Sequence, residues 1–230
     1  GNDSLTGYYG DDVYKFNLGD GQDVIYGENS SYSNQYGIDK IVFGEGITEL
    51  DVELKPNGYH LIIDIIGTED QITLYEYFSS DSLSDGFAVK SLEFADGATL
   101  DLTTGLELIG SENADNIKGT SGNDTLMGLG GDDTINGNNG DDVIYGGEGN
   151  DSLTGYYGDD VIYGGEGNDY INGNNGDDVI YGGEGNDSLT GYYGDDVYKF
   201  NLGDGQDVIY GENSSYSNQY GIDKIVFGEG

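Results

Sequence analysis

Residues 137–172 read GNNGDDVIY, GGEGNDSLT, GYYGDDVIY and GGEGNDYIN, four blocks of nine that all begin with glycine and carry aspartate in sixth position. The same block repeats without a gap from residue 110 to residue 199, ten times in all. The eighth residue is apolar, or tyrosine in the last block. A fixed internal period of this kind indicates a repeat architecture, so the rest of the sequence is interpreted from it.

Each block predicts one turn and one short strand. Glycines in positions one and four allow positive φ and close backbone approach, so we expect the first six residues to form a turn. The last three alternate around one apolar side chain, which is typical of a short strand with that side chain facing inward. Blocks of two kinds alternate, so one coil takes 18 residues and contributes two strands. Stacked coils then form two parallel sheets with strands about 4.8 Å apart.

The sixth-position aspartates fall into two columns when the coils stack. Adjacent carboxylates in a column lie about 5 Å apart, an arrangement that is unfavourable unless a cation lies between them. Ca²⁺ suits a flexible oxygen site completed by turn carbonyls. The alternative, a merely solvated acidic surface, does not explain an aspartate fixed at every ninth residue beside glycine. That alternative is the better interpretation of the fifth-position acids Asp132, Asp141, Asp159, Asp177 and Asp195.

The blocks resemble the RTX (repeats-in-toxin) family, whose calcium-binding repeats read G-G-x-G-x-D-x-U-x. The resemblance implies an all-β fold, a right-handed parallel β-roll in which each Ca²⁺ is held by two sixth-position aspartates and by backbone carbonyls. The regular ligands it implies make eight sites: Asp115, Asp124, Asp133, Asp142, Asp151, Asp160, Asp169, Asp178, Asp187 and Asp196.

The pattern continues past insertions at both ends of the chain. The expected pairs there are Asp187 with Asp207, Asp196 with Asp223, Asp3 with Asp23, and Asp12 with Asp39. The total expectation is about 8 to 12 calcium ions, by extension of the family pattern. Tyrosine tolerates positive φ poorly, so we expect altered turns and weaker sites at Tyr156 and Tyr192.

A longer repeat sets the predicted domains. Residues 185–230 repeat residues 1–46 without a change, a period of 184. We therefore expect the end of one roll at 1–46, a separate module at 47–109, and a roll at 110–230, and we interpret the chain as a window on a longer tandem protein rather than a designed repeat. The module alternates apolar residues around turn signals such as Asn57 and Gly58, which predicts a small β-meander that caps the roll. A short helix is an alternative near 78–87. Through GTEDQITLYEYF (67–78) and LEFADGATLDL (92–102) the module resembles the haemolysin-type calcium-binding related domain.

Composition excludes several functions. With 45 acidic and 7 basic residues, a net charge of −38, the chain offers no basic face for nucleic acid and would be repelled by anionic membranes. It has no cysteine, no apolar run long enough to span a membrane, and no nucleophile, zinc or nucleotide-binding motif. Its one histidine, His60, falls in an expected strand. We expect no enzymatic activity.

The favoured function is a calcium-dependent structural segment of a large secreted bacterial protein, at the cell surface or outside the cell: an adhesin, fibre or matrix component. The alternative is a secretion and folding module, of the type I secretion kind that the resemblance implies, attached to a secreted enzyme or toxin. Tandem copies favour the first. Lateral pairing of rolls is a candidate homotypic contact, through an outward row that we call the Val/Tyr stripe: Val143, Tyr145, Val161, Tyr163, Val179 and Tyr181. Simple β propensity is the alternative reason for that row.

Overall fold

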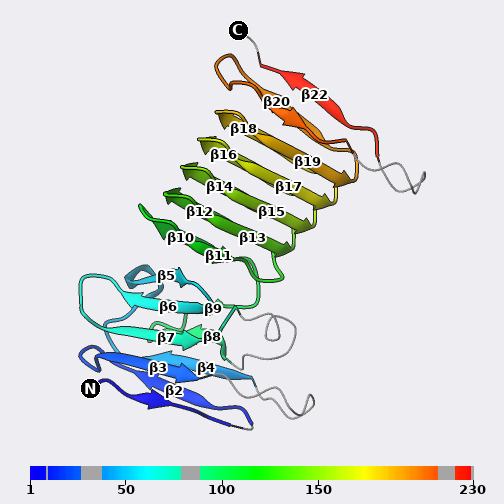
Figure 1. Ribbon diagram of the computed structural model, residues 1–230. Coiled ribbons are helices and arrows are strands. Elements are labelled where there is room, and N and C mark those ends of the chain that lie inside the picture. Colours follow the sequence, from blue (N-terminus) through cyan, green and yellow to red (C-terminus); the bar gives the residue numbers. More distant parts are fainter. Residues whose placement is uncertain (9, 27–37, 79–88, 212–220, 229–230) are drawn as a thin grey trace. The chain divides into compact units, whose positions relative to one another are not determined.

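The computed structural model describes residues 1–8, 10–26, 38–78, 89–211 and 221–228. It divides into two compact units, Gly1–Thr104 and Gly105–Gly230. Across the described residues the regular structure is β-strand apart from one 3-10 turn, η1 (Glu49–Asp51), which confirms the all-β roll (Figure 1). No described helix is long and apolar enough to cross a membrane.

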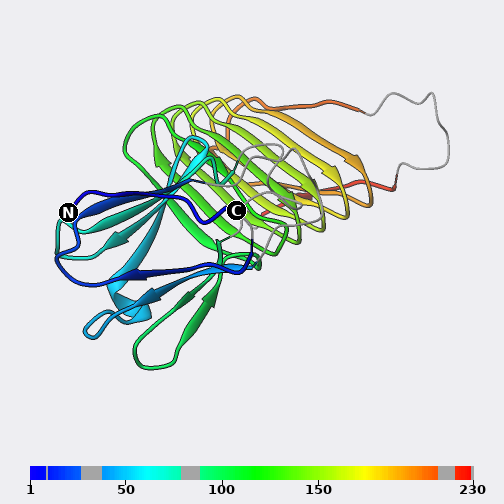
Figure 2. The same cartoon turned by 90° about the horizontal axis from the view of Figure 1, so that it is seen from below.

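The second unit is built from two parallel sheets whose strands alternate along the chain. Figure 2 shows its coils nested one behind another. Each strand pairs with the strand 18 residues away in strict register, so that Ile144 faces Ile162 and Ile162 faces Ile180. One sheet contains β10 (Glu107–Ser111), β12 (Thr125–Gly130), β14 (Val143–Glu148), β16 (Val161–Glu166), β18 (Val179–Glu184), β20 (Val197–Phe200) and β22 (Lys224–Phe227). The other contains β11 (Asn116–Lys118), β13 (Thr134–Asn139), β15 (Ser152–Tyr157), β17 (Tyr170–Asn175), β19 (Ser188–Tyr193) and β21 (Val208–Ile209).

The regular strands are longer than the sequence pattern predicts. A strand such as β14 begins at the seventh residue of one block and ends at the third residue of the next. The prediction that the first six residues form a turn is therefore wrong in extent, because the turn occupies positions four to six. The reason is the register: with identical spacing in every coil, Gly147 and Glu148 face Gly165 and Glu166 and extend the ladder.

Eighth-position side chains form the core of the second unit, as predicted. They are at most 2% exposed, and each lies in register with its counterpart on the next coil. The first-position glycines also point inward. A Cβ on Gly146 would collide with the Asp151 carboxylate and with the Gly164 carbonyl oxygen, so the close packing of coils requires glycine there. The core columns are Ile117, Ile135, Leu153, Ile171 and Leu189 in one sheet, and Leu126, Ile144, Ile162, Ile180 and Tyr198 in the other.

Tyrosine in position two does not disturb the turn. Tyr156 and Tyr192 adopt φ of 94° and 76°, beside 118° for the glycine in the same position at Gly147. Tyr156 also keeps its register with Asn138 and Asn174. The expected change of turn geometry is therefore absent: the side chains take the left-handed conformation, and the backbone strain is the cost.

The first unit continues two sheets of the same kind and then closes them with hairpins. One sheet has the order β1 (Ser4–Leu5), β3 (Gln22–Tyr26), β7 (Gln71–Tyr75), β6 (His60–Ile65) and β5 (Val52–Asn57). The other has the order β2 (Val13–Phe16), β4 (Asp39–Phe43), β8 (Val89–Glu93) and β9 (Thr99–Asp101). Strands β1 to β4 pair in parallel, whereas β5, β6 and β7 and the pair β8 and β9 are antiparallel.

The hairpins are not a free-standing sheet, because each extends a sheet that residues 1–46 begin. Strand β7 pairs in parallel with β3, and β8 with β4, so the module lies directly on the last coil. Phe43 stacks on Phe94 at 5.3 Å between ring centroids, and His60 stacks on Tyr75 while its Nδ1 accepts the Glu76 N–H. Leu50, predicted to face inward in a strand, is 90% exposed in η1. The suggested helix near 78–87 falls, after Phe78, outside the described residues.

Candidate metal centre: two columns of buried aspartates

The sixth-position aspartates of the second unit are buried at the point where each turn enters a strand. From Asp124 to Asp196 they are at most 2% exposed. One carboxylate oxygen of each has a fixed partner: the N–H of Asp142 donates to Oδ1 of Asp160, and the N–H of Asp160 donates to Oδ1 of Asp178. The same bond, 2.7 to 2.9 Å long, joins every successive pair in both columns. Each carboxylate thus ties its coil to the preceding one.

The second carboxylate oxygen has no protein partner. A buried acceptor left unpaired costs about 1–3 kcal/mol, and more when it is charged. Eight such oxygens in the roll, and one in the first unit, therefore require a proton or a cation. They are Oδ2 of Asp133, Asp142, Asp151, Asp160, Asp169, Asp178, Asp187 and Asp196, and of Asp12.

The pKa values of these carboxyls respond to their surroundings. Burial, with a smaller contribution from neighbouring carboxylates, raises the pKa of Asp142 and of Asp178 to about 8. Burial raises the pKa of Asp160 and of Asp169 to about 7. The hydrogen bonds to Oδ1 oppose these shifts without cancelling them. The columns therefore hold protons near neutral pH unless a cation replaces them.

The donor set fits a hard cation. Among the described residues, no three acidic, histidine or cysteine side chains converge on one point, so side chains alone do not make a metal cage. Backbone oxygen is close by, however: Asp151 Oδ2 and the Gly164 carbonyl oxygen lie against the same face of Gly146. Calcium accepts six to eight oxygens of mixed carboxylate and carbonyl origin, which is what these turns present.

The first coil of the roll satisfies its carboxylates in another way. Ser111 and Thr120 stand in position two of the first two blocks, and each directs its N–H and hydroxyl at the aspartate of its own block. The partners are Asp115 and Asp124, so neither of these has an unpartnered Oδ2. The sequence carries this signal as a hydroxyl residue where the other blocks have glycine, leucine, asparagine or tyrosine, and we did not use it.

The insertions at the ends preserve the pairing. The N–H of Asp187 donates to Asp207 at 2.9 Å, across 20 residues instead of 18. In the same way Asp196 donates to Asp223, Asp3 to Asp23 and Asp12 to Asp39. Thus the structure brings together each pair that the pattern joined. Asp39 differs in one respect, because the Tyr14 side chain also hydrogen-bonds to it.

Fifth-position side chains have a structural role that sequence reasoning missed. They are exposed, as expected, but each accepts a hydrogen bond from the next coil: Asp159 accepts the N–H of Asp177, and Asn150 that of Asn168. Their bonds run in the opposite direction along the stack to those of the sixth position. One edge carries Asp141, Asp159, Asp177 and Asp195, and the other carries mainly asparagine: Asn150, Asn168 and Asn186.

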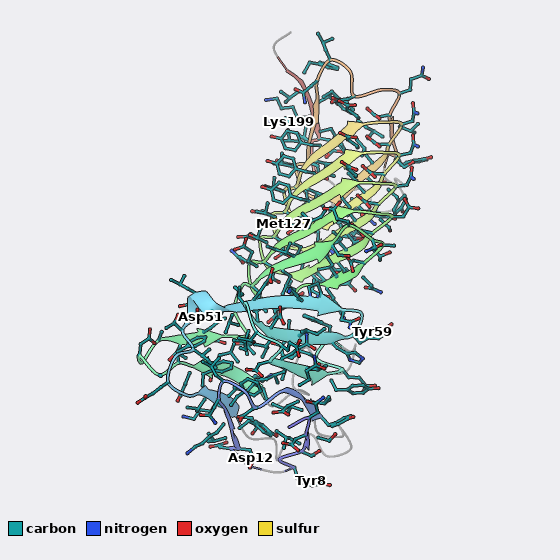
Figure 3. All side chains as sticks on the ribbon, turned by 90° about the vertical axis from the view of Figure 1, so that its left-hand side faces the viewer. Tyr8, Asp12, Asp51, Tyr59, Met127 and Lys199 are labelled. Atoms are coloured by element: carbon teal, nitrogen blue, oxygen red, sulfur yellow. The ribbon has the colours of Figure 1, made fainter. Side chains whose placement is uncertain are left out.

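The Val/Tyr stripe is an ordered row on the outer face of one sheet. Tyr145, Tyr163 and Tyr181 stack in sequence, with ring centroids 4.9 and 4.5 Å apart and planes nearly parallel. Met127 and Lys199 occupy the two ends of the row, on one face of the roll (Figure 3). Because the rings cover one another's faces, the row offers edges rather than the flat faces on which a sugar would stack.

Comparison with known families matches this geometry. The RTX calcium-binding nonapeptide repeat, taken four copies at a time, matches residues 1–22, 109–144, 136–171, 145–180 and 172–204, together more than half of the chain. The chain belongs to the RTX calcium-binding repeat family. The haemolysin-type calcium binding protein related domain matches residues 60–104, within the hairpin module of the first unit. A search of curated proteins found no match. The RTX repeats identify the roll as a calcium-binding repeat region of the kind found in secreted proteins.

Proposed function

We propose that this chain is a structural segment of a large secreted protein, an adhesin, fibre or matrix component, which folds when it binds calcium outside the cell. The observation that carries the proposal is the double column of buried, unpartnered carboxylate oxygens. In the proposed sites each Ca²⁺ lies between the aspartates of adjacent coils and takes its remaining ligands from turn carbonyls. The 16 aspartates expected from the family pattern are the proposed ligands, for about 8 to 12 ions.

Charge explains why folding depends on the metal. A net charge of −38 on 230 residues opposes compaction. The core of the roll is a single apolar side chain per block, too little to overcome that repulsion. Metal binding supplies the difference, so its free energy is folding free energy. Extracellular calcium modules bind with Kd of about 10⁻⁴–10⁻³ M, which would keep this chain unfolded at low calcium and folded outside.

A second candidate is a secretion and folding module that serves an enzyme or toxin elsewhere in a longer chain. The exact 184-residue repeat favours a structural segment, because a module that only assists folding gains little from a duplicated copy. The length and composition of the parent gene distinguish the two: many tandem copies support the structural segment, and one catalytic domain beside a single roll supports the second candidate.

Circular dichroism of the intact chain tests the proposal. In excess chelator we expect the spectrum of a largely disordered chain, and millimolar calcium should restore a β spectrum cooperatively. Magnesium at the same concentration is the control, since it demands a tighter octahedral shell than these turns offer. A β spectrum that persists unchanged in excess chelator would contradict the proposal.

A further inference from the structure

The chain contains the same 46 residues in two different settings. Residues 1–46 lie against the hairpin module, and residues 185–230 form the last coils of the roll. Any difference between the two copies therefore reflects what covers them and not their sequence. This makes the first copy a direct record of the partner that the second copy can accept.

In the first copy the outer strand edges are paired. Strand β3 pairs with β7, placing Val24 opposite Thr73, and β4 pairs with β8, placing Ile41 opposite Leu92. An ion pair crosses the second contact, with Lys40 Nζ 2.8 Å from Glu93 Oε1. The contact is therefore both apolar and charge-matched.

In the second copy the same edges are open. Strands β21 and β22 are the last strands of their sheets among the described residues. Ile225 and Phe227 are 51% and 76% exposed, whereas their counterparts Ile41 and Phe43 are 0% and 2% exposed. Lys224, the counterpart of Lys40, is exposed as well. An open parallel edge with exposed apolar residues favours pairing with another strand.

We propose that β21 and β22 form a docking surface for residues 47–104 of a second copy of this chain. Residues 185–230 of one molecule take the place of residues 1–46 on the hairpins of the next. The contacts are those already present in the first unit, with Val208 opposite the second copy's Thr73 and Lys224 beside its Glu93.

The exchange is a competition between identical segments with different anchoring. Residues 1–46 have the advantage of belonging to the same chain as the module, which gives them a high effective concentration. Residues 185–230 are held in the docking conformation by the roll, because β19 and β20 pair with β17 and β18. Docking therefore increases with protein concentration and requires calcium. The contact is heterologous, since different surfaces meet, so molecules join in open series and not in closed pairs.

Disulfide trapping tests the proposal, since the native chain has no cysteine. Thr73→Cys combined with Val208→Cys places two thiols opposite each other only if the proposed register forms. In calcium and mild oxidant we expect disulfide-linked dimers and longer species that increase with protein concentration. Adding Ile25→Asp and Ile41→Asp, which weakens the hold of the first copy, should increase the linked fraction several-fold.

The repeat supplies matched controls. Val24→Cys with Thr73→Cys should give a disulfide within the monomer, which verifies that this register permits the bond. Ile209→Asp with Ile225→Asp, the same changes placed in the second copy, should abolish the linked species. If the Ile25→Asp and Ile41→Asp chain fails to give a β spectrum in calcium, the otherwise native chain at rising concentration decides. The proposal is overturned if the 73–208 disulfide is absent there, is confined to monomers, or survives Ile209→Asp with Ile225→Asp.

Discussion

Each sixth-position aspartate performs two tasks with its two oxygens. Oδ1 receives a backbone N–H from the preceding coil, and Oδ2 is left for a cation. The first task needs only an acceptor, so asparagine could perform it, and asparagine does so in the fifth position of one edge. The second task needs a carboxylate. This separation explains why position five varies between aspartate and asparagine while position six does not.

Asp160→Asn should remove calcium sites without removing the bond between coils. Asp160 faces both Asp142 and Asp178, so we expect the loss of two ions and of about 3 kcal/mol of calcium-dependent stability, the scale for breaking a buried charged pair. Asp159→Asn is the matched control, because asparagine in position five still accepts the N–H of the next coil. Calorimetric titration counts the ions in each variant. Equal losses in the two would show that the wrong column has been assigned.

Backbone strain is concentrated in position two. Tyr156 sits at φ of 94°, a region that costs a side chain about 1–3 kcal/mol, and half of the blocks avoid this cost with glycine. We expect Tyr156→Gly to raise stability in calcium by about 1 kcal/mol. Tyr157→Gly, at an extended residue of β15, should lower stability. Chemical denaturation of both variants measures this. A Tyr156→Gly variant less stable than the native chain would mean that its ring packing outweighs the strain.

At the scale of the strand, the sequence predicted direction better than length. Alternation around one apolar residue correctly placed Ile144 and Ile162 inside and Tyr145 and Tyr163 outside. It could not reveal that the ladder continues into glycine-rich residues, because those residues have no side-chain pattern and pair only through the register. Nor does spacing disclose that β7 and β8 pair with β3 and β4, since such contacts join segments some 50 residues apart.

The Val/Tyr stripe carries the prediction of lateral pairing. Tyr145 is 40% exposed, and an apolar row in water favours burial at about 25 cal/mol per Å². Replacing Tyr145, Tyr163 and Tyr181 with serine should leave calcium binding intact and lower the sedimentation coefficient of the calcium-loaded protein. Tyr170→Ser, an exposed tyrosine on the other sheet, is the control. If the native protein is already monomeric at high concentration in millimolar calcium, the stripe is only a sheet face.

For the whole molecule, the ligand columns could be predicted from spacing alone, while the details at their ends could not. A nine-residue period fixes which side chains stack, so all the aspartate pairs follow from it. The closing of the first coil by Ser111 and Thr120, and the bond from Tyr14 to Asp39, depend on single substitutions and on local packing. The domain boundaries at 46 and 109 remain a proposal for the same reason.

Protons and calcium should compete along the whole roll. Because burial raises the pKa of carboxyls such as Asp142 and Asp178 to about 8, the metal-free folded chain holds protons that the unfolded chain releases. Its stability is therefore greatest at low pH and is lost as pH rises toward 8. Calcium affinity should change in the opposite sense and fall as pH drops from 8 to 6.

Circular dichroism at pH 8, 7, 6 and 5 checks both trends. In chelator the β signal should grow as pH falls, and in calcium titrations the midpoint should move to higher concentration. A parallel series in added salt separates this effect from general repulsion, which salt screens. Metal-free stability that is constant or rises with pH would contradict it.

The opposed hydrogen bonds of positions five and six have a mechanical consequence. Every junction between coils is fastened from both sides, and coils touch only their neighbours, so tension along the stack detaches the terminal coil before the next. Each detached coil of 18 residues releases about 60 Å of extended chain. The roll thus lengthens in equal steps under load, and the calcium concentration around it sets the force at which the first step occurs.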